Sequence, residues 1–126
     1  MEEILEGIIQ RGIKVKWASF CRFDYASKFT ENFWNLIEES GCTSISFGGE
    51  SGSQDILDSV IRKDVKLDQM FKVTERMART NISQIVSFMS GVPLEKKEDL
   101  MKTFAVIDML VKLNPSIIPN GIFFYT

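Results

Sequence analysis

The stretch Thr43-Ser44-Ile45-Ser46-Phe47-Gly48-Gly49-Glu50-Ser51-Gly52-Ser53 joins a short β-branched and aromatic run to a glycine-rich loop. A second stretch has the same form, with Ile82 to Phe88 followed by Met89-Ser90-Gly91-Val92-Pro93-Leu94-Glu95. Each predicts a strand, a loop and then a helix. If the strands are parallel neighbours, both loops open at one edge of the sheet, where α/β sheets and barrels place their ligands. We therefore expect a small-molecule site at that edge.

Periodicity predicts the other elements. The expected order is helix 2–11, strand 13–20, helix 30–40, strand 43–47, helices 53–61 and 68–80, strand 82–89, helix 96–113 and strand 117–125. The longest apolar stripe lies on helix 96–113 and comprises Leu100, Phe104, Ile107, Leu110 and Val111. Three helices are expected to end at residues that tolerate a left-handed backbone, namely Gly12, Gly41 and Asn81. Alternating strands and helices imply a parallel α/β sheet with right-handed crossovers.

The predicted strands have one apolar face and one small, partly polar face. In the strand 43–47, Ser44 and Ser46 alternate with Ile45 and Phe47. Parallel strands buried on both faces read as continuous apolar runs, so this alternation favours a barrel with an inner cavity over a doubly wound sheet. The alternative to a barrel cavity is an ordinary core in which the serine hydroxyls are hydrogen-bonded.

The number of predicted strands indicates a partial (β/α) TIM-type barrel of about four parallel strands. A complete (β/α)₈ barrel takes about 250 residues, whereas this chain has 126 and reaches Phe123-Phe124-Tyr125-Thr126 in or just after a strand. We therefore expect residues 1–126 to form one domain, a barrel fragment truncated at both ends. Its edge strands, 13–20 and 117–125, are apolar and aromatic, and exposed edges of this kind template pairing. A homo-oligomer is expected.

Composition excludes several classes of protein and site. A net charge of −2 with mixed signs gives no footprint for nucleic acid, and no apolar run is long enough to span a membrane. The acidic N-terminus does not read as a signal sequence, so a cytoplasmic protein is expected. Histidine is absent, and the two cysteines, Cys21 and Cys42, are predicted at opposite ends of neighbouring strands. Neither a disulfide nor a four-thiolate metal site is therefore expected.

Several motifs, taken in order, resemble the second half of a radical SAM core. They are Lys16-Trp17, Arg22-Phe23-Asp24, Glu39-Ser40-Gly41-Cys42, Phe47-Gly48-Gly49-Glu50-Ser51-Gly52-Ser53-Gln54, Arg62-Lys63 and Phe88-Met89-Ser90-Gly91-Val92-Pro93-Leu94-Glu95. They are most similar to the subgroup that often carries a cobalamin-binding domain upstream. The resemblance implies a partial (β/α)₆ barrel in which a [4Fe–4S] cluster, held by a CxxxCxxC loop, reduces S-adenosylmethionine to a 5′-deoxyadenosyl radical.

The CxxxCxxC loop is absent from these 126 residues. The resemblance therefore implies a fragment that keeps part of the S-adenosylmethionine-binding wall and is not catalytic alone. The cluster, and any cobalamin, would belong only to a longer parent protein. By the same resemblance, the cofactor-binding positions are Gly48, Glu50, Ser51, Arg62, Lys63, Met89, Ser90, Gly91 and Pro93.

Physical alternatives remain open for the charged positions. A carboxylate at Glu50 suits a ribose or methionyl contact, but it also suits the dipole of the helix that follows. Arg62 or Lys63 matches a basic position that faces the cofactor carboxylate, although either side chain can also be a solvated charge. Arg22 and Asp24 either bind substrate or pair with each other. Leu94 stands where the family has glycine, so the local turn is in doubt.

Two other functions compete with the radical SAM hypothesis. The first alternative is a non-catalytic interaction or scaffold domain built from βα repeats. The second is a nucleotide-binding module of the open doubly wound type, which is disfavoured because no strand is followed by GxGxxG or GxxxxGK.

Overall fold

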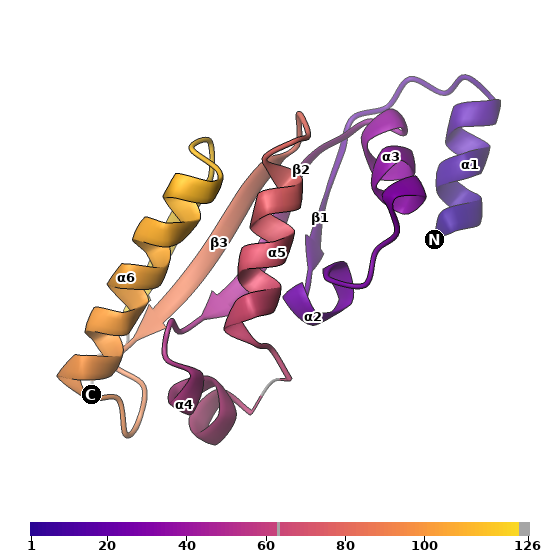
Figure 1. The fold of residues 1–126 in the computed structure, drawn as a ribbon. Helices are drawn as coiled ribbons and strands as arrows, with labels where there is room; N and C mark the ends of the chain where they lie inside the picture. Colours follow the sequence, from indigo (N-terminus) through magenta and orange to yellow (C-terminus); the bar gives the residue numbers. More distant parts are fainter. Residues whose placement is uncertain (63, 124–126) are drawn as a thin grey trace.

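The computed structural model describes residues 1–62 and 64–123 and builds them around a sheet of four parallel strands (Figure 1). The strands are β1 (Trp17–Cys21), β2 (Cys42–Glu50), β3 (Ser83–Ser90) and β4 (Ile118–Phe123), and they lie side by side in chain order. The helices are α1 (Glu2–Gln10), α2 (Phe23–Ala26), α3 (Glu31–Glu39), α4 (Gln54–Ile56), the π-helix η1 (Leu57–Ile61), α5 (Leu67–Met77) and α6 (Lys97–Leu113). The predicted parallel α/β fold is confirmed.

Pairing moves the predicted strand ends. The strand expected over 13–20 begins only at Trp17, because Trp17 pairs with Cys42, the first residue of β2, and the residues before it have no neighbouring strand. The strand expected over 43–47 extends to Glu50, because the glycine segment still pairs with β3. In the last predicted strand, Phe124 and Tyr125 lie outside the described residues.

Three features of the helices differ from the prediction. Helix α2 was missed because four residues are too short to show a period. The helix expected over 53–61 starts with Ser53 as its N-cap and changes to a π-helix at Leu57. Helix α5 is capped by Lys66 and ends at Met77, so Asn81 does not end it. The main chain of Asn81 instead donates to Glu38 Oε2 at 2.6 Å. Gly12 and Gly41 do have positive φ, as expected.

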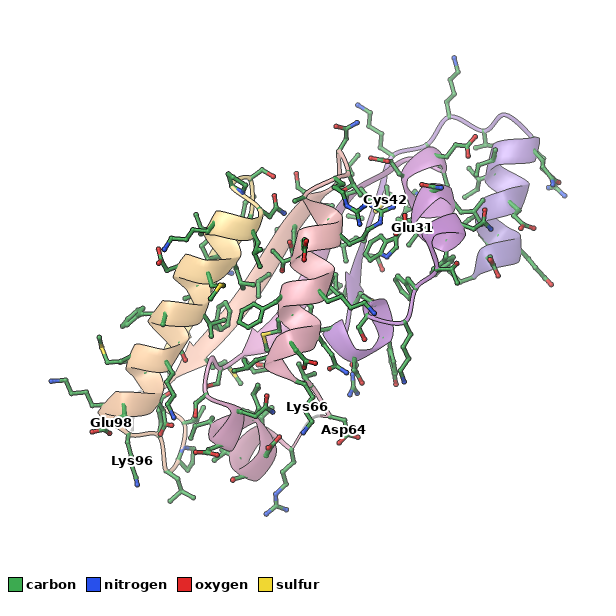
Figure 2. All side chains as sticks on the ribbon, viewed as in Figure 1. Glu31, Cys42, Asp64, Lys66, Lys96 and Glu98 are labelled. Atoms are coloured by element: carbon green, nitrogen blue, oxygen red, sulfur yellow. The ribbon has the colours of Figure 1, made fainter. Side chains whose placement is uncertain are left out.

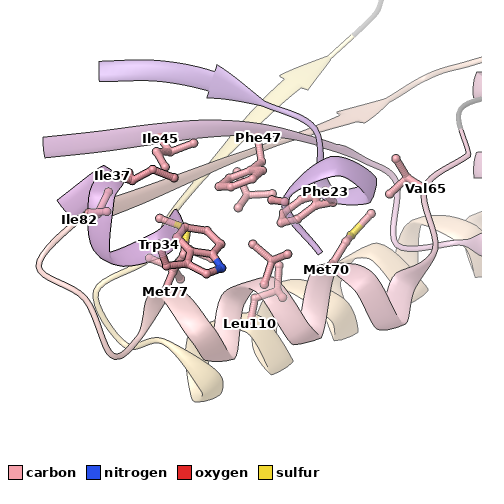
Figure 3. Close-up of a cluster of buried hydrophobic side chains, with 14 of the residues drawn as sticks. Phe23, Trp34, Ile37, Ile45, Phe47, Val65, Met70, Met77, Ile82 and Leu110 are labelled. Carbon is pink, nitrogen blue, oxygen red and sulfur yellow. The ribbon is translucent and has the colours of Figure 1, made fainter. Parts of the chain in front are cut away.

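The two faces of the sheet differ as the alternation predicts. Ile45, Phe47, Val86 and Phe88 are buried beneath the helices, and Figure 3 shows Ile45 and Phe47 on the strands above Met70, Met77 and Leu110. The other face carries Ser44, Ser46, Gly48, Ile85, Ser87 and Met89, all of which are only partly buried. It is this open face that corresponds to the inside of a barrel.

The apolar stripe predicted on α6 is rotated. The buried residues of this helix are Asp99, Thr103, Val106 and Leu110. Phe104 is 53% exposed and lines an open pocket together with Pro119 and Gly121 of β4. The residues of α6 that face the sheet are therefore partly polar, and two of them, Asp99 and Thr103, bind the loop that follows β2.

Cys21 and Cys42 are free thiols at opposite ends of neighbouring strands. Cys42 pairs with Trp17 at the start of the sheet, whereas Cys21 pairs with Phe47. The expected absence of a disulfide between them follows from this register. In the part of the chain that the structure describes, no helix is long and apolar enough to cross a membrane.

The core depends on the short helix α2, through a stacked pair of rings. Phe23 is fully buried and lies 4.5 Å, centroid to centroid, from Phe47 of β2. Phe23→Ala is expected to lower the free energy of unfolding by about 3–5 kcal/mol, because it leaves a cavity in the core. Phe23→Leu keeps most of the volume and is expected to cost much less. Denaturant titration measures both, and equal small losses would show that α2 does not close the core.

Candidate cofactor site at the carboxyl edge of the sheet

The register brings the two predicted loops to one edge. Gly48 pairs with Ser87 and, after a one-residue shift, Glu50 pairs with Phe88. The end of β2 therefore lies beside Met89 and Ser90, which end β3. This is the juxtaposition that the two glycine-containing motifs predicted, and it places Gly48, Glu50 and the segment from Met89 to Gly91 together at the carboxyl ends of parallel strands.

Glu50 has a strained main chain. Its φ is +67°, and the Ser51 N–H donates to the Gly49 carbonyl at 2.8 Å, so the three residues form a γ-turn centred on a non-glycine residue. The turn coincides with the register shift, and bulges of this kind re-aim a side chain at the end of a strand. Non-glycine residues held in such a conformation cluster at active sites and ligand clamps.

The loop after β2 is joined to α6 by buried hydrogen bonds. The Gly52 N–H donates to Thr103 Oγ1 at 2.9 Å, and the Ser53 hydroxyl donates to Asp99 Oδ1 at 2.7 Å. The Ser53 N–H also donates to the Ser51 hydroxyl oxygen at 3.0 Å. We call Ser51, Gly52, Ser53, Asp99 and Thr103 the loop–helix network.

Close packing in this network explains Gly52. A Cβ at that position would lie 2.4 Å from the Thr103 Cα, which leaves no room for any side chain. The Ser51 side chain is also buried, and its hydroxyl lies within hydrogen-bonding distance of Ser53 and Thr103. Any contact of Ser51 with a ligand would therefore come from its main chain.

The loop after β3 contains a type II turn. The Glu95 N–H donates to the Val92 carbonyl at 3.2 Å, Pro93 occupies the second position and Leu94 the third, with φ at +68°. The third position normally requires glycine. Leu94 thus replaces the family's glycine yet keeps the glycine conformation, and its side chain is 80% exposed. The turn that Leu94 placed in doubt is formed.

Sequence reasoning gave Glu95 no role, but its side chain shapes this loop. Glu95 Oε1 accepts from the Ser90 hydroxyl at 2.9 Å and from the Gly91 N–H at 3.0 Å. Its second oxygen, Oε2, is buried and has no hydrogen-bond partner among the described residues. Glu95 thus fixes the direction in which β3 ends. The signal was its place in the Gly91-to-Glu95 motif.

The open face adds two polar residues that the sequence analysis did not single out. Ser87 pairs with Gly48 on one side and with Asn120 of β4 on the other. The three form one row across the open face, one step below the edge. The pairing of Ser87 with Gly48 puts Ser87 on this face, and the pairing with β4 puts Asn120 there as well.

The predicted substrate residues pair with each other. Arg22 donates through Nε and Nη2 to the two oxygens of the buried Asp24 side chain, at 3.0 and 2.9 Å. The hydrogen bond with Asp24 raises the pKa of Arg22 above its ordinary value. Arg22 also lies 4.9 Å from the centroid of the Tyr25 ring. These contacts favour the structural alternative for the pair.

The basic position after η1 is described only in part. Arg62 has φ at +55°, is exposed and donates through Nε to the Ser59 carbonyl at 3.4 Å, so its side chain folds back over its own helix. Lys63 lies outside the described residues. The structure therefore does not bring Arg62 into the group formed by Gly48, Glu50 and Met89.

The thiols do not fit an iron–sulfur cluster. Desolvation by burial raises the pKa of Cys21 and raises the pKa of Cys42 to about 11, so both are protonated at neutral pH. Figure 2 shows Cys42 at the end of the molecule away from Lys96 and Glu98, which lie near the carboxyl edge of the sheet. Within residues 1–62 and 64–123, no three metal-ligating side chains gather into a candidate metal site.

Two solved structures share this architecture. Both are of the radical S-adenosylmethionine methyltransferase TsrM from Kitasatospora setae, one with cobalamin and a [4Fe–4S] cluster and one with tryptophan and a SAM analogue. The TM-scores are 0.75 and 0.72 at 16% sequence identity, over 97% and 86% of this chain. The chain has the fold of part of a radical SAM methyltransferase. The matched region is 24% and 22% of the two TsrM chains.

A curated relative points the same way. An uncharacterized methyltransferase of Pyrococcus horikoshii is 28% identical over 96 residues, which is 76% of this chain and 20% of the relative. Comparison with known protein families gives no match. This chain thus spans about a fifth to a quarter of the proteins that it matches, and a relationship to radical SAM methyltransferases is supported.

The strained turn gives a stability prediction. Leu94→Gly is expected to raise the free energy of unfolding by about 0.5–1 kcal/mol, because glycine adopts positive φ without the steric penalty that a side chain meets. Leu94→Ala removes the exposed side chain but keeps the strain, and is expected to stay within about 0.5 kcal/mol of the parent. Thermal or denaturant unfolding measures both. A gain in the alanine variant equal to that of glycine would assign the effect to the side chain.

The loop–helix network gives a pH prediction. The Ser53 hydroxyl, followed by the Lys96 N–H, lowers the pKa of Asp99. A carboxyl with a lowered folded-state pKa stabilises the fold above its unfolded pKa, near 3.9, and loses that contribution as the pH falls through the folded pKa. Ser53→Ala should therefore cost most stability above about pH 5 and progressively less in stronger acid. Ser53→Thr keeps the hydroxyl and is the control; a pH-independent deficit in Ser53→Ala would contradict the coupling.

Proposed function

We propose that this chain is the carboxyl-terminal part of a radical SAM barrel and that its strand ends form part of a wall that binds S-adenosylmethionine. The observation that carries the proposal is the position of the strained Glu50 turn, which pairs with Phe88 and so lies beside the Met89-to-Gly91 segment at one edge. The similarity to TsrM in fold supports it. Catalysis would then belong to a longer parent protein.

The chemistry of the edge suits a zwitterionic nucleoside. A carboxylate at Glu50 can accept hydrogen bonds from ribose hydroxyls or from the methionyl ammonium group, and Gly48 lets a ligand approach the main chain closely. The main chain from Met89 to Gly91 would lie along the adenine, and Pro93 and Glu95 hold this segment in place. Arg62 and Lys63 are proposed only as additional groups near the cofactor carboxylate.

The proposal leaves the cluster to other residues. Cys42 is buried and Cys21 is half-buried, both are protonated, and they lie at opposite ends of neighbouring strands, so this chain cannot supply three cluster ligands. A [4Fe–4S] cluster, when bound to S-adenosylmethionine in this family, generates the radical. Cobalamin would be a further cofactor of the parent protein.

The proposal extends to the cellular location and the partners of the protein. We infer a cytoplasmic protein that binds neither nucleic acid nor membrane, because its charges are balanced and mixed. We also infer that it self-associates through its exposed strand edges. A non-catalytic βα scaffold is the competing function, and ligand binding distinguishes the two.

The cofactor wall predicts weak but specific binding. The chain should bind S-adenosylmethionine with a Kd in the high micromolar to millimolar range, roughly −4 to −5.5 kcal/mol, because only part of the site is present. Glu50→Gln keeps the size of the side chain and should weaken binding about tenfold through loss of charge-assisted hydrogen bonds. Glu6→Gln on α1 removes an equal charge far from the edge and should leave binding unchanged. Titration calorimetry or ligand-observed NMR measures all three.

Three results would contradict this function. Sub-micromolar affinity would require a complete site in this chain. Equal binding by the parent and Glu50→Gln, or no binding at millimolar ligand, would remove the Glu50 edge from the cofactor wall and favour the scaffold function.

A further inference from the structure

A pocket opens on the helix-covered side of the sheet. It has a volume of about 230 Å³ and lies between α5 on one side and α2, α3 and their connecting segment on the other. Among the described residues, none from a strand or from the loops after β2 and β3 lines it. Sites for drug-sized ligands take about 300–1,000 Å³, so this pocket suits a smaller ligand.

Arg76 of α5 is the most firmly held group of the pocket. Its side chain is only 13% exposed, and its guanidinium lies 5.7 Å from the centroid of the Trp34 ring, within the range of a cation–π interaction. Trp34 belongs to the buried core that Figure 3 shows. The guanidinium is thus fixed before any ligand arrives, so it loses little further freedom when it binds an oxyanion.

The carboxylate of Glu31 occupies the fork of this guanidinium. Arg76 Nε donates to Glu31 Oε1 and Oε2 at 2.9 and 3.1 Å, and Arg76 Nη2 lies 2.9 Å from Oε2. The Glu31 side chain, however, is 68% exposed, so water competes for it, and an ion pair of this kind contributes little to stability. A largely buried arginine paired with an exposed carboxylate is a site whose internal occupant a better anion can replace.

Two further cations line the pocket. Arg79 Nη2 lies 4.0 Å from Glu31 Oε1, beyond hydrogen-bonding distance. Lys72 Nζ donates to the Ser27 carbonyl at 2.9 Å, and its ammonium group has two more protons to donate. Lys72, Arg76 and Arg79 are four and three residues apart along α5, so they share one face of the helix. In the part of the chain that the structure describes, Glu31 is the only carboxylate that pairs with these three cations.

We propose that this pocket binds a small phosphate monoester, whose phosphate displaces Glu31 from Arg76. A phosphate group carries about −1.5 to −2 charges at neutral pH and three acceptor oxygens, so it matches three cations better than one carboxylate does. Apolar groups of Ala26, Phe29 and Val73 line the same pocket and would contact the organic part of the ligand. The pocket shares no residue with the carboxyl edge, so the proposal stands whether or not that edge binds S-adenosylmethionine.

Removal of the internal carboxylate tests the displacement. The parent chain should bind phenyl phosphate saturably at millimolar concentration, and Glu31→Gln should strengthen this binding about two- to fivefold, because the phosphate no longer competes with an ion pair. Glu75→Gln is the matched control. It removes an equal charge from the lining of the same pocket, but Glu75 forms no ion pair among the described residues, so the gain should be clearly smaller. Calorimetry measures the affinities, and circular dichroism shows that each variant is folded.

The arginine fork is tested by a substitution that keeps its charge. Arg76→Lys loses the planar fork, and we expect it to weaken the binding of phenyl phosphate about tenfold. Arg11→Lys, beyond the end of α1, is the control and should leave the affinity unchanged. Equal affinities of the parent and Arg76→Lys would remove Arg76 from the site and overturn the proposal.

Comparison with benzoate tests the class of ligand. Benzoate has the same ring but only a carboxylate, so it should bind about tenfold more weakly than phenyl phosphate. Benzoate binding as tightly as phenyl phosphate would assign the pocket to carboxylates and overturn the phosphate assignment. The absence of saturable phenyl phosphate binding by the parent chain, or equal gains in Glu31→Gln and Glu75→Gln, would also overturn the proposal.

Discussion

The hydrogen bond from the Gly52 N–H to Thr103 Oγ1 is the contact on which the candidate site depends. It fixes the loop after β2 to α6, and α6 is itself the continuation of the loop after β3. The two loops that carry the candidate cofactor residues are therefore held relative to each other by one helix. Asp99 adds to this, because it bonds the Ser53 hydroxyl with one oxygen and the Lys96 N–H with the other. A change in α6 is thus transmitted to both loops.

Buried polar contacts also hold the carboxyl-terminal end of α6 in place. Gln84 of β3 is fully buried, donates to Thr74 Oγ1 of α5 at 2.9 Å and accepts from Asn114 Nδ2, just after α6, at 3.1 Å. A buried amide left without partners costs more than a typical hydrogen bond contributes, so these contacts favour one position of α5 and α6 on the sheet. The polar residues among the buried line of α6 serve the same purpose.

Much of the architecture was accessible from the sequence, because side-chain alternation depends only on the two-residue period of a strand. Ser44 and Ser46 were assigned to the open face for this reason, and the structure confirms it. Helix α2 and the exposure of Phe104 were not predictable in this way. A four-residue helix shows no period, and the pocket that Phe104 lines also takes in residues of β4, which are distant in sequence.

The candidate site was predictable in position but not in detail. Glycine-rich loops after two strands located the edge, whereas the role of Ser51 within the loop–helix network required the contact with Thr103, 52 residues away in sequence. The positive φ of Glu50 could not be predicted either, because a glutamate in the sequence does not indicate a left-handed backbone. The neighbouring Gly49 is required by close packing, since a Cβ at that position would lie 2.8 Å from the Val86 side chain.

Backbone strain is concentrated at one end of the molecule. Among the described residues, the non-glycine positions with positive φ are Glu50, Arg62 and Leu94. Glu50 is the last residue of β2, Arg62 follows η1, and Leu94 lies in the loop after β3. Each costs roughly 1–2 kcal/mol relative to glycine-compatible geometry. Leu94 recovers little of this through packing, because most of its side chain is in solvent. The loop–helix network and the contacts of Glu95 hold the carboxyl edge of the sheet in these strained conformations, which bring no gain in stability. Backbone strain that is maintained in this way is typical of binding sites.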